Sequence, residues 1–295
     1  MSLAAGRPKP GSAPSGGSAA SPARKRWGYM TEPVMTLQRG TTPLLISLPH
    51  VGIDIPAELT PLFVERALQV EDTDWHLEPL YAFAPELVAR LIVPRHSRYV
   101  IDLNRPPENT SMYAGANNTE LCPTRFFTGE PLYHATFAEE AAEIARRRDA
   151  YWRPYHEALD AELSRLKRQD GHALLWDGHS IKSELPWLFE GRLPDLNLGT
   201  VGGTSCVPSL RQSLIDVLHR QTAFSHVADG HFKGGHITRH YGRPKQGIHA
   251  VQLEMCWSCY MAEQPPYEID PARARRLQPV LRSLLQAALD WRPDA

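Results

Sequence analysis

Long hydrophobic runs are missing from this 295-residue sequence. It contains no stretch of about 18 apolar residues, the length that spans a bilayer, and its N-terminus lacks the apolar core of a secretory signal. An excess of one charge is missing too, because 32 Lys and Arg residues face 33 Asp and Glu residues. This balance argues against a protein that coats nucleic acid. We therefore expect a globular protein of the cytoplasm with no membrane or nucleic-acid partner.

Cysteine is scarce, with four residues in the whole chain. Cys256 and Cys259 form the one C-x-x-C pair, which taken alone is compatible with half a zinc site or a redox motif. No second C-x-x-C pair follows it. We therefore favour free, buried thiols that pack as small apolar side chains.

Acidic residues are absent from residues 1–27, which are rich in Gly, Pro, Ser and Ala. Such a segment buries too little apolar area to order itself, so we expect a disordered tail. Arg24, Lys25 and Arg26 suit a nucleic-acid-binding arm, but no aromatic residues alternate with them and we favour this alternative less. Residues 28–295 are expected to form a single α/β domain.

Short apolar runs alternate with helical patterns along this domain, which predicts a mixed, largely parallel central sheet flanked by helices. The helix predicted before residue 168 should break near Pro154. A loop rich in Gly and His is expected over 229–247. The predicted strands are 43–48, 91–94, 98–103, 172–180 and 249–255, and the predicted helices are 75–90, 136–168, 208–221 and 271–291.

Polar residues stand where four of the predicted strands end: His50, Asn104 with Arg105, His179 and Glu254. Because the site of such a sheet lies at the carboxyl ends of its strands, we expect them to converge. Two histidines and a carboxylate, with one position left for water, are what catalytic zinc requires. An arginine beside an asparagine suits a carboxylate ligand, since the guanidinium offers two parallel donors.

Each of these residues also has a structural interpretation. A histidine at a strand end is more often hydrogen-bonded than metal-bound, and Arg105 can pair with Asp102 or cap a loop. Glu254 lies inside an apolar run, where an unpartnered carboxylate costs several kcal/mol. We therefore favour a functional role for Glu254.

Five sequence blocks resemble one enzyme family, N-formylglutamate amidohydrolase, and the resemblance spans most of residues 40–260. The blocks are LISLPHVGIDIP at 45–56, EDTDWHLEPLY at 71–81, SRYVIDLNRPPENTS at 97–111, LLWDGHS at 174–180 and GGHITRHYG at 234–242. The family is similar to zinc carboxypeptidases and aspartoacylase, which implies an α/β sandwich with one divalent metal, Zn²⁺ being favoured.

This resemblance implies hydrolysis of N-formyl-L-glutamate, a small dicarboxylate, to formate and L-glutamate during histidine degradation. A related metallo-hydrolase acting on another N-acyl amino acid or on a peptide is the nearest alternative. A non-catalytic metal-binding or ligand-binding protein is an alternative of another class. Such a protein needs no residue that transfers protons, so we favour it least.

The resemblance also implies roles for individual residues. His50 and His179 match the two metal-binding histidines, and Glu254 matches the general base. Arg98 matches the arginine that polarises the scissile carbonyl, and Asn104 with Arg105 matches the pair that holds the substrate carboxylate.

The acidic metal ligand departs from the pattern of the related enzymes. They carry it three residues after the first histidine, but that position here is Ile53. We favour Asp72 as the ligand, with Asp74 second and Asp54 third.

The block at 234–242 adds candidate substrate contacts. His236 and His240 are four residues apart, a spacing that binds metal on a helix, but the surrounding glycines predict a loop. We expect both to be substrate-loop residues and Arg239 to be a second partner for a substrate carboxylate.

Overall fold

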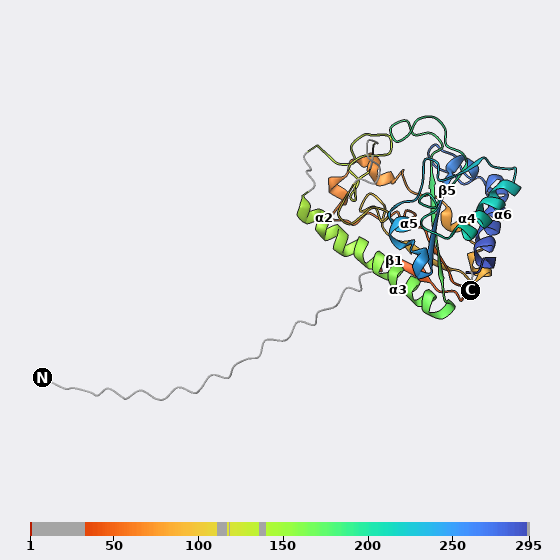
Figure 1. Cartoon of the computed structure of the whole chain (residues 1–295). Helices are drawn as coiled ribbons and strands as arrows, with labels where there is room; N and C mark the ends of the chain where they lie inside the picture. Colours follow the sequence, from red (N-terminus) through yellow and green to blue (C-terminus); the bar gives the residue numbers. More distant parts are fainter. Residues whose placement is uncertain (2–32, 111–116, 118, 136–139, 294–295) are drawn as a thin grey trace. The chain divides into compact units, whose positions relative to one another are not determined.

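The computed structural model describes residues 33–110, 117, 119–135 and 140–293, together with Met1 (Figure 1). Pro33–Ala295 forms a compact unit separate from Met1–Glu32. The predicted tail, residues 1–27, and the following residues 28–32 lie outside the described residues apart from Met1. No helix of the described part of the chain is long and apolar enough to cross a membrane.

A sheet of seven strands in the order β1-β3-β2-β4-β7-β5-β6 forms the centre of Pro33–Ala295. Four neighbouring pairs are parallel, whereas β1 pairs with β3 and β5 pairs with β7 in antiparallel fashion. The predicted mixed, largely parallel sheet is therefore confirmed. The strands are β1 Met35–Gln38, β2 Leu44–Ser47, β3 Arg90–Pro94, β4 Ala173–Ile181, β5 Leu196–Gly199, β6 His226–Ala228 and β7 Ile248–Cys256.

Helices cover both faces of this sheet (Figure 1). The α-helices are α1 Leu77–Leu80, α2 Ala141–Arg147, α3 Arg153–Asp170, α4 Pro208–Arg220, α5 His236–Tyr241 and α6 Pro271–Asp290. The 3₁₀ and π segments are η1 Thr60–Leu62, η2 Glu65–Gln69, η3 Ala84–Leu87, η4 Arg148–Trp152, η5 Pro244–Gln246 and η6 Trp257–Cys259. The helices α3 and α5 contribute to one apolar core, and α1, α4 and α6 contribute to the other.

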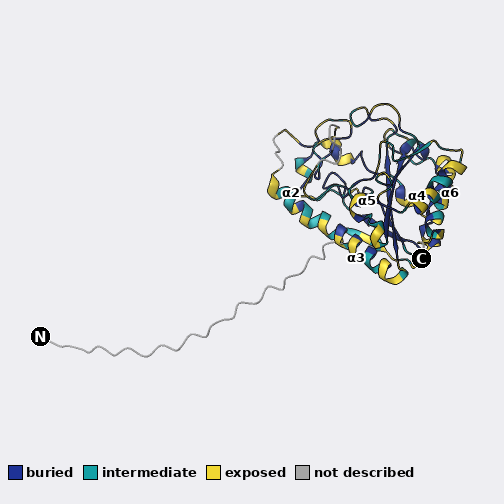
Figure 2. Ribbon diagram, viewed as in Figure 1, coloured by how far each residue is buried: buried dark blue, intermediate teal, exposed yellow. Residues whose placement is uncertain are grey.

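The strands separate these two cores because successive side chains of a strand point to opposite faces. In β4, Leu174 and Trp176 pack in the core of α4 and α6, and Ala173 and Leu175 pack in the core of α3. Figure 2 shows the strands buried between helices whose outer surfaces are exposed. The sheet thus carries apolar side chains on both faces along most of its length.

Polar side chains replace the apolar ones on the α3 face toward the ends of β4 and β7. Asp177 and His179 continue the row that begins with Ala173 and Leu175. In register with them on β7 stand Gln252 and Glu254. All four are buried, so the sheet itself brings a compact polar group to its carboxyl edge.

The predicted helix over 75–90 is wrong as one continuous helix. The segment forms α1, Leu77–Leu80, and the 3₁₀ turn η3, Ala84–Leu87. Pro79 and Pro85 lack the N–H that a helix interior needs, and Val88 adopts a left-handed backbone conformation that ends the turn.

The strand predicted at 98–103 is also wrong. Val100 N–H donates to the Ser97 carbonyl, and Asp102 N–H donates to the carbonyl of Leu121. The backbone therefore bonds within a turn and to a loop, not to a neighbouring strand. The segment is buried, and its branched apolar side chains therefore resemble the pattern of a strand.

The predicted break near Pro154 is confirmed. The π-helical turn η4, Arg148–Trp152, separates α2 from α3 just ahead of this proline. Pro154 lacks an N–H and its ring crowds the carbonyl one turn back, so the wider turn accommodates it. Residues 136–139 of the predicted segment lie outside the described residues.

Two buried histidines at the amino edge of the sheet predict a loss of stability in acid. His249 and His172 flank the Trp291 ring, and Nδ1 of His249 has no hydrogen-bond partner among the described residues. Burial, reinforced by His172, lowers the pKa of His249 to about 4. The unfolded chain therefore binds more protons than the folded one, and stability should fall as the pH falls from about 6.5 toward 4.

His249→Leu should flatten this dependence by up to about 1.4 kcal/mol per pH unit, the effect of one proton. Urea unfolding between pH 7 and pH 4 measures it, with exposed His219→Gln as control. An unchanged slope in His249→Leu would show that His249 is not the group responsible.

Candidate active site

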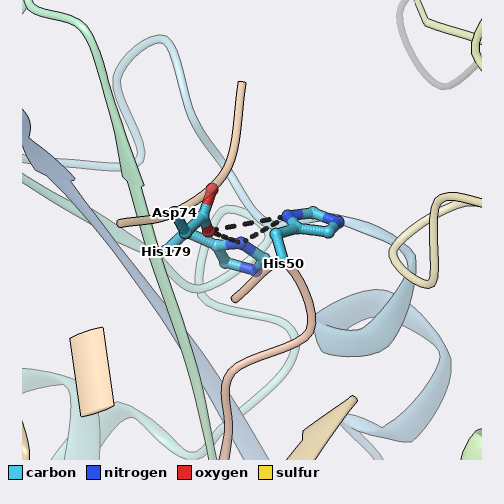
Figure 3. Close-up of side chains that lie close together, drawn as sticks. All are labelled: His50, Asp74 and His179. Atoms are coloured by element: carbon cyan, nitrogen blue, oxygen red, sulfur yellow. Dashed lines mark hydrogen bonds and ion pairs between the residues drawn. The ribbon is translucent and has the colours of Figure 1, made fainter. Parts of the chain in front are cut away.

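Three buried side chains, His50, Asp74 and His179, meet at the carboxyl edge of the sheet (Figure 3). His179 Nδ1 lies 3.2 Å from His50 Nδ1 and 3.2 Å from Asp74 Oδ2. His50 Nδ1 lies 3.6 Å from the same Asp74 oxygen. The three atoms thus form a small triangle of potential metal ligands.

The separations in this triangle fit a tetrahedral metal. Ligands that lie 2.0–2.1 Å from zinc are about 3.3 Å apart in a tetrahedron. Two ring nitrogens 3.2 Å apart cannot both present lone pairs unless a proton or a cation lies between them. The site is therefore a candidate metal site made of two imidazoles and one carboxylate.

Neighbouring carboxylates orient both imidazoles. His50 Nε2 lies 2.7 Å from Asp102 Oδ1, and His179 Nε2 lies 3.0 Å from Asp177 Oδ1. A carboxylate that accepts from one ring nitrogen leaves the other free to bind metal, the usual arrangement around metal-binding histidines.

The charges of the triangle depend on these same contacts. Burial alone raises the pKa of Asp74, but the contacts with His179 and His50 outweigh it and hold the pKa well below its usual range. Burial lowers the pKa of His179, but Asp177 and Asp74 outweigh it and raise the pKa well above its usual value. Without a metal, a proton on His179 therefore balances the Asp74 carboxylate.

The structure places Asp74 in the triangle, whereas the sequence favoured Asp72 as the acidic ligand. Asp72 Oδ2 instead accepts from the Tyr99 hydroxyl at 2.8 Å and from the Phe127 N–H at 2.9 Å. Burial raises the pKa of Asp72 to about 6. The third candidate, Asp54, is partly exposed and pairs with Arg95. Asp74 reaches the triangle because its N–H donates to the carbonyl of His50.

A cavity of about 560 Å³ opens onto the triangle. It brings together most of the residues that the sequence proposed for the site, whereas Asp72, Asp54, His236 and His240 do not line it. The proposed residues that line it are His50, Arg98, Asn104, Arg105, His179, Arg239 and Glu254. Phe127, Gln252 and Lys233 also line the cavity.

Glu254 lies on β7 beside His179 in the parallel register. Its Oε2 accepts from Gln252 Nε2 at 3.3 Å. Burial raises the pKa of Glu254 to about 8, against the opposing charge of His179. Glu254 is thus a buried carboxyl group on the cavity wall beside His179, which makes it a candidate for proton transfer.

Arg98 is held beside the triangle by two carboxylates. Its Nη2 donates to Asp102 Oδ2 at 2.9 Å, and its Nη1 lies 3.5 Å from Asp74 Oδ1. The guanidinium also lies 4.5 Å from the centre of the Phe127 ring. Arg98 is thus a fixed positive charge on the cavity wall next to the candidate metal site.

Asn104 and Arg105 follow Asp102 along the cavity wall. Asn104 Nδ2 lies 3.0 Å from His179 Nε2, and Asn104 Oδ1 accepts from the Ile237 N–H at 2.7 Å. The Arg105 guanidinium donates to the carbonyl and the hydroxyl of Thr119. These bonds hold a second positive charge at the cavity.

The segment 229–247 was expected to be a loop, which is wrong for its centre. His236 and His240 lie on helix α5, and their rings stack with centroids 5.1 Å apart. Arg239, from the same helix, lines the cavity and its Nε donates to the Gly234 carbonyl at 2.8 Å. Gly235 allows the start of α5 to lie against the side chain of Asn104, because a Cβ at position 235 would be only 2.3 Å from Asn104 Nδ2.

Sequence reasoning missed the partners of the two histidines and the cation Lys233. Asp177 stands two residues before His179, so strand alternation places both on one face and could have revealed it. Asp102 was considered only as a partner of Arg105, because the bond to His50 joins segments far apart in the chain. No sequence signal distinguishes Lys233 from other loop lysines.

Replacing the two aspartates separately should identify the metal ligand. Asp74→Asn should weaken binding of a divalent metal by at least about 100-fold, beyond the usual cost of changing a residue that only orients a ligand. Asp72→Asn should bind metal like the parent protein. Metal titration and elemental analysis measure both, and the opposite result would make Asp72 the ligand.

The chain resembles known proteins over most of its length. The family described as N-formylglutamate amidohydrolase matches residues 42–261. "N-formylglutamate deformylase" of Pseudomonas putida is 49% identical over 258 residues, which are 88% of this chain and 96% of that protein. The protein of the same name from Pseudomonas aeruginosa is 47% identical, over 88% of this chain and 97% of that one.

Solved structures resemble the fold. N-formylglutamate amidohydrolase from Ralstonia eutropha JMP134 superimposes with a TM-score of 0.72 at 24% identity, over 86% of this chain and 95% of that chain. Gene product Atu2144 from Agrobacterium tumefaciens gives a TM-score of 0.67 at 17% identity, over 87% and 93% of the two chains. At these identities the structures speak for the fold alone. The family match and the two Pseudomonas relatives show that this chain belongs to the N-formylglutamate amidohydrolase family.

Proposed function

We propose that this protein hydrolyses the formyl amide of N-formyl-L-glutamate, releasing formate and L-glutamate. One observation carries the proposal. A single cavity combines a His–Asp–His triangle, a buried glutamate and several arginines, on a chain 49% identical to an N-formylglutamate deformylase. The reaction belongs to histidine degradation, and we propose the cytoplasm as its place.

His50, Asp74 and His179 are the residues that would hold one divalent metal, for which we propose Zn²⁺. Two imidazoles and a carboxylate are a common ligand set for catalytic zinc, and the separations of 3.2–3.6 Å agree with it. Such a metal lowers the pKa of a bound water and polarises a carbonyl. The carboxylates of Asp102 and Asp177 lie 2.7 and 3.0 Å from the Nε2 atoms of His50 and His179, contacts that favour a proton on Nε2 and leave Nδ1 for the metal.

Glu254 is proposed as the general base. It takes a proton from the attacking water and returns that proton to the nitrogen of the departing glutamate. Both transfers need a carboxyl group within the site, and Glu254 is a buried glutamate that lines the cavity. Its position beside His179 in the sheet places it at the candidate metal site.

The arginines provide for the negative charges of substrate and transition state. Arg98 lies beside the triangle, where it would stabilise the oxyanion that develops on the formyl carbonyl. Asn104 and Arg105 are proposed to bind one substrate carboxylate, and Arg239 is proposed to bind the other. A substrate with two carboxylates thus meets one cationic residue for each.

Comparison of acyl groups tests this proposal against a hydrolase of another N-acyl amino acid. N-formyl-L-glutamate should be turned over with a kcat/KM at least about tenfold above that of N-acetyl-L-glutamate, the usual scale for one extra carbon in a pocket that excludes it. A glutamate-containing dipeptide should be a poorer substrate still. Preference for the acetyl or peptidyl compound would contradict the proposal.

Glu254→Gln separates catalysis from metal binding. It keeps the size of the side chain and removes the base, so kcat should fall by about 10² or more while the bound metal stays. Steady-state kinetics and metal analysis of the same sample measure both. Loss of the metal would make Glu254 a ligand, and unchanged kcat would exclude it as the base.

A further inference from the structure

Two side chains one turn apart, Trp152 at the end of η4 and His156 in α3, hold the backbone of the cavity wall. Trp152 Nε1 donates to the carbonyl of Arg105 at 3.0 Å, and His156 Nε2 donates to the carbonyl of Leu103 at 2.8 Å. The two rings stack with centroids 3.7 Å apart. They therefore fix the residues on both sides of Asn104.

The same pair also holds α5, the helix that carries Arg239. The Tyr241 hydroxyl lies 3.0 Å from both Nδ1 and the carbonyl oxygen of His156. The His236 ring lies 5.8 Å from Trp152 and 5.5 Å from His156, measured between centroids. Trp152 and His156 thus contact both the segment of Arg105 and helix α5, which carries Arg239.

Direct bonds between the two segments close the arrangement. The N–H groups of His236 and Ile237 donate to the backbone and side-chain oxygens of Asn104. Residues 103–105, helix α5 and helix α3 therefore each contact the other two. Arg105 and Arg239 consequently have little freedom to move independently of each other.

His156 has no evident role in proton transfer. It is buried and does not line the cavity. Burial lowers the pKa of His156 to about 3, so the ring is neutral at physiological pH. Since the Leu103 carbonyl only accepts, Nε2 carries the ring proton. The neutral imidazole therefore holds the Leu103 carbonyl and the Tyr241 hydroxyl in place through its two ring nitrogens.

We propose that Trp152 and His156 are positioning residues that set the spacing between Arg105 and Arg239, and so select dicarboxylates with the chain length of glutamate. This inference rests on the proposed function. Two guanidiniums at a fixed spacing bind both carboxylates of a matching substrate, whereas N-formyl-L-aspartate is one methylene shorter and cannot satisfy both without displacing its formyl group.

The test is the ratio of kcat/KM for N-formyl-L-glutamate to that for N-formyl-L-aspartate in the metal-loaded enzyme. A missing methylene usually changes kcat/KM by about 10- to 200-fold in a pocket fitted to the longer substrate. Trp152→Phe keeps an aromatic ring at this position and removes the donor to the Arg105 carbonyl. It should lower the ratio at least about threefold, because the Arg105 backbone gains freedom and the spacing is no longer fixed.

Trp291→Phe is the matched control, because it also removes an indole donor, the one that Trp291 Nε1 gives to Ser209 Oγ at 3.0 Å, and neither residue lines the cavity. A general loss of stability lowers the yield of active enzyme for both substrates equally and leaves the ratio unchanged. A folded Trp152→Phe variant with the parent ratio would overturn the proposal. So would an equal loss of the ratio in Trp291→Phe.

Tyr241→Phe provides a second, independent variant should Trp152→Phe not fold. It removes the hydroxyl that joins α5 to His156, and we expect the ratio to fall in the same direction. An unchanged ratio here would also count against the proposal.

Arg105→Ala distinguishes this failure from failure of the proposed function. It should raise KM for both substrates by about tenfold or more, since both lose a charge-assisted pair. If Arg105→Ala does so while Trp152→Phe leaves the ratio unchanged, the carboxylate contact stands and the positioning role falls. If the parent enzyme does not hydrolyse N-formyl-L-glutamate, the proposed function itself is wrong.

Discussion

The buried carboxylate of Asp102 connects the separate parts of the site. One oxygen accepts from His50 Nε2 at 2.7 Å and from the Asn104 N–H at 2.8 Å, and the other accepts from Arg98 Nη2 at 2.9 Å. Burial raises the pKa of Asp102, but its interactions with His50, Arg105 and Arg98 outweigh it and keep the pKa well below its usual range. A single charge thus orients a proposed metal ligand, the proposed oxyanion partner and the loop that carries the carboxylate-binding pair.

The sheet supplies the other half of the site by register. The parallel pairing of β4 with β7 sets His179 beside Glu254 and Asp177 beside Gln252. Shifting this register by one residue would turn these side chains into the opposite core, which is apolar. The same alternation that buries Leu175 and Ala250 therefore fixes the distance between a proposed metal ligand and the proposed base.

The strand ends could be predicted from the sequence because apolar runs that stop at polar residues are a local signal. His50, His179 and Glu254 were found in this way, and all three line the cavity. The choice between Asp72 and Asp74 was not available locally, because both stand in one short block. It depends on Tyr99 and Phe127, which engage Asp72 from other parts of the chain. The strand predicted at 98–103 was wrong for a related reason. The segment is buried because other parts of the chain pack over it, and not because it belongs to the sheet.

Charge balance gives a physical reason for a cation at the triangle. Four buried carboxyl groups, those of Asp74, Asp102, Asp177 and Glu254, surround it, and Arg98 is the buried arginine that pairs with them. Burying more carboxylates than cations is costly. In the metal-free protein the pKa values of His179 and Glu254 are raised, so that bound protons reduce the excess negative charge. A divalent cation would replace those protons with a stronger charge at the same place. It would also release Glu254 to its ionised form, which is the form that a general base requires.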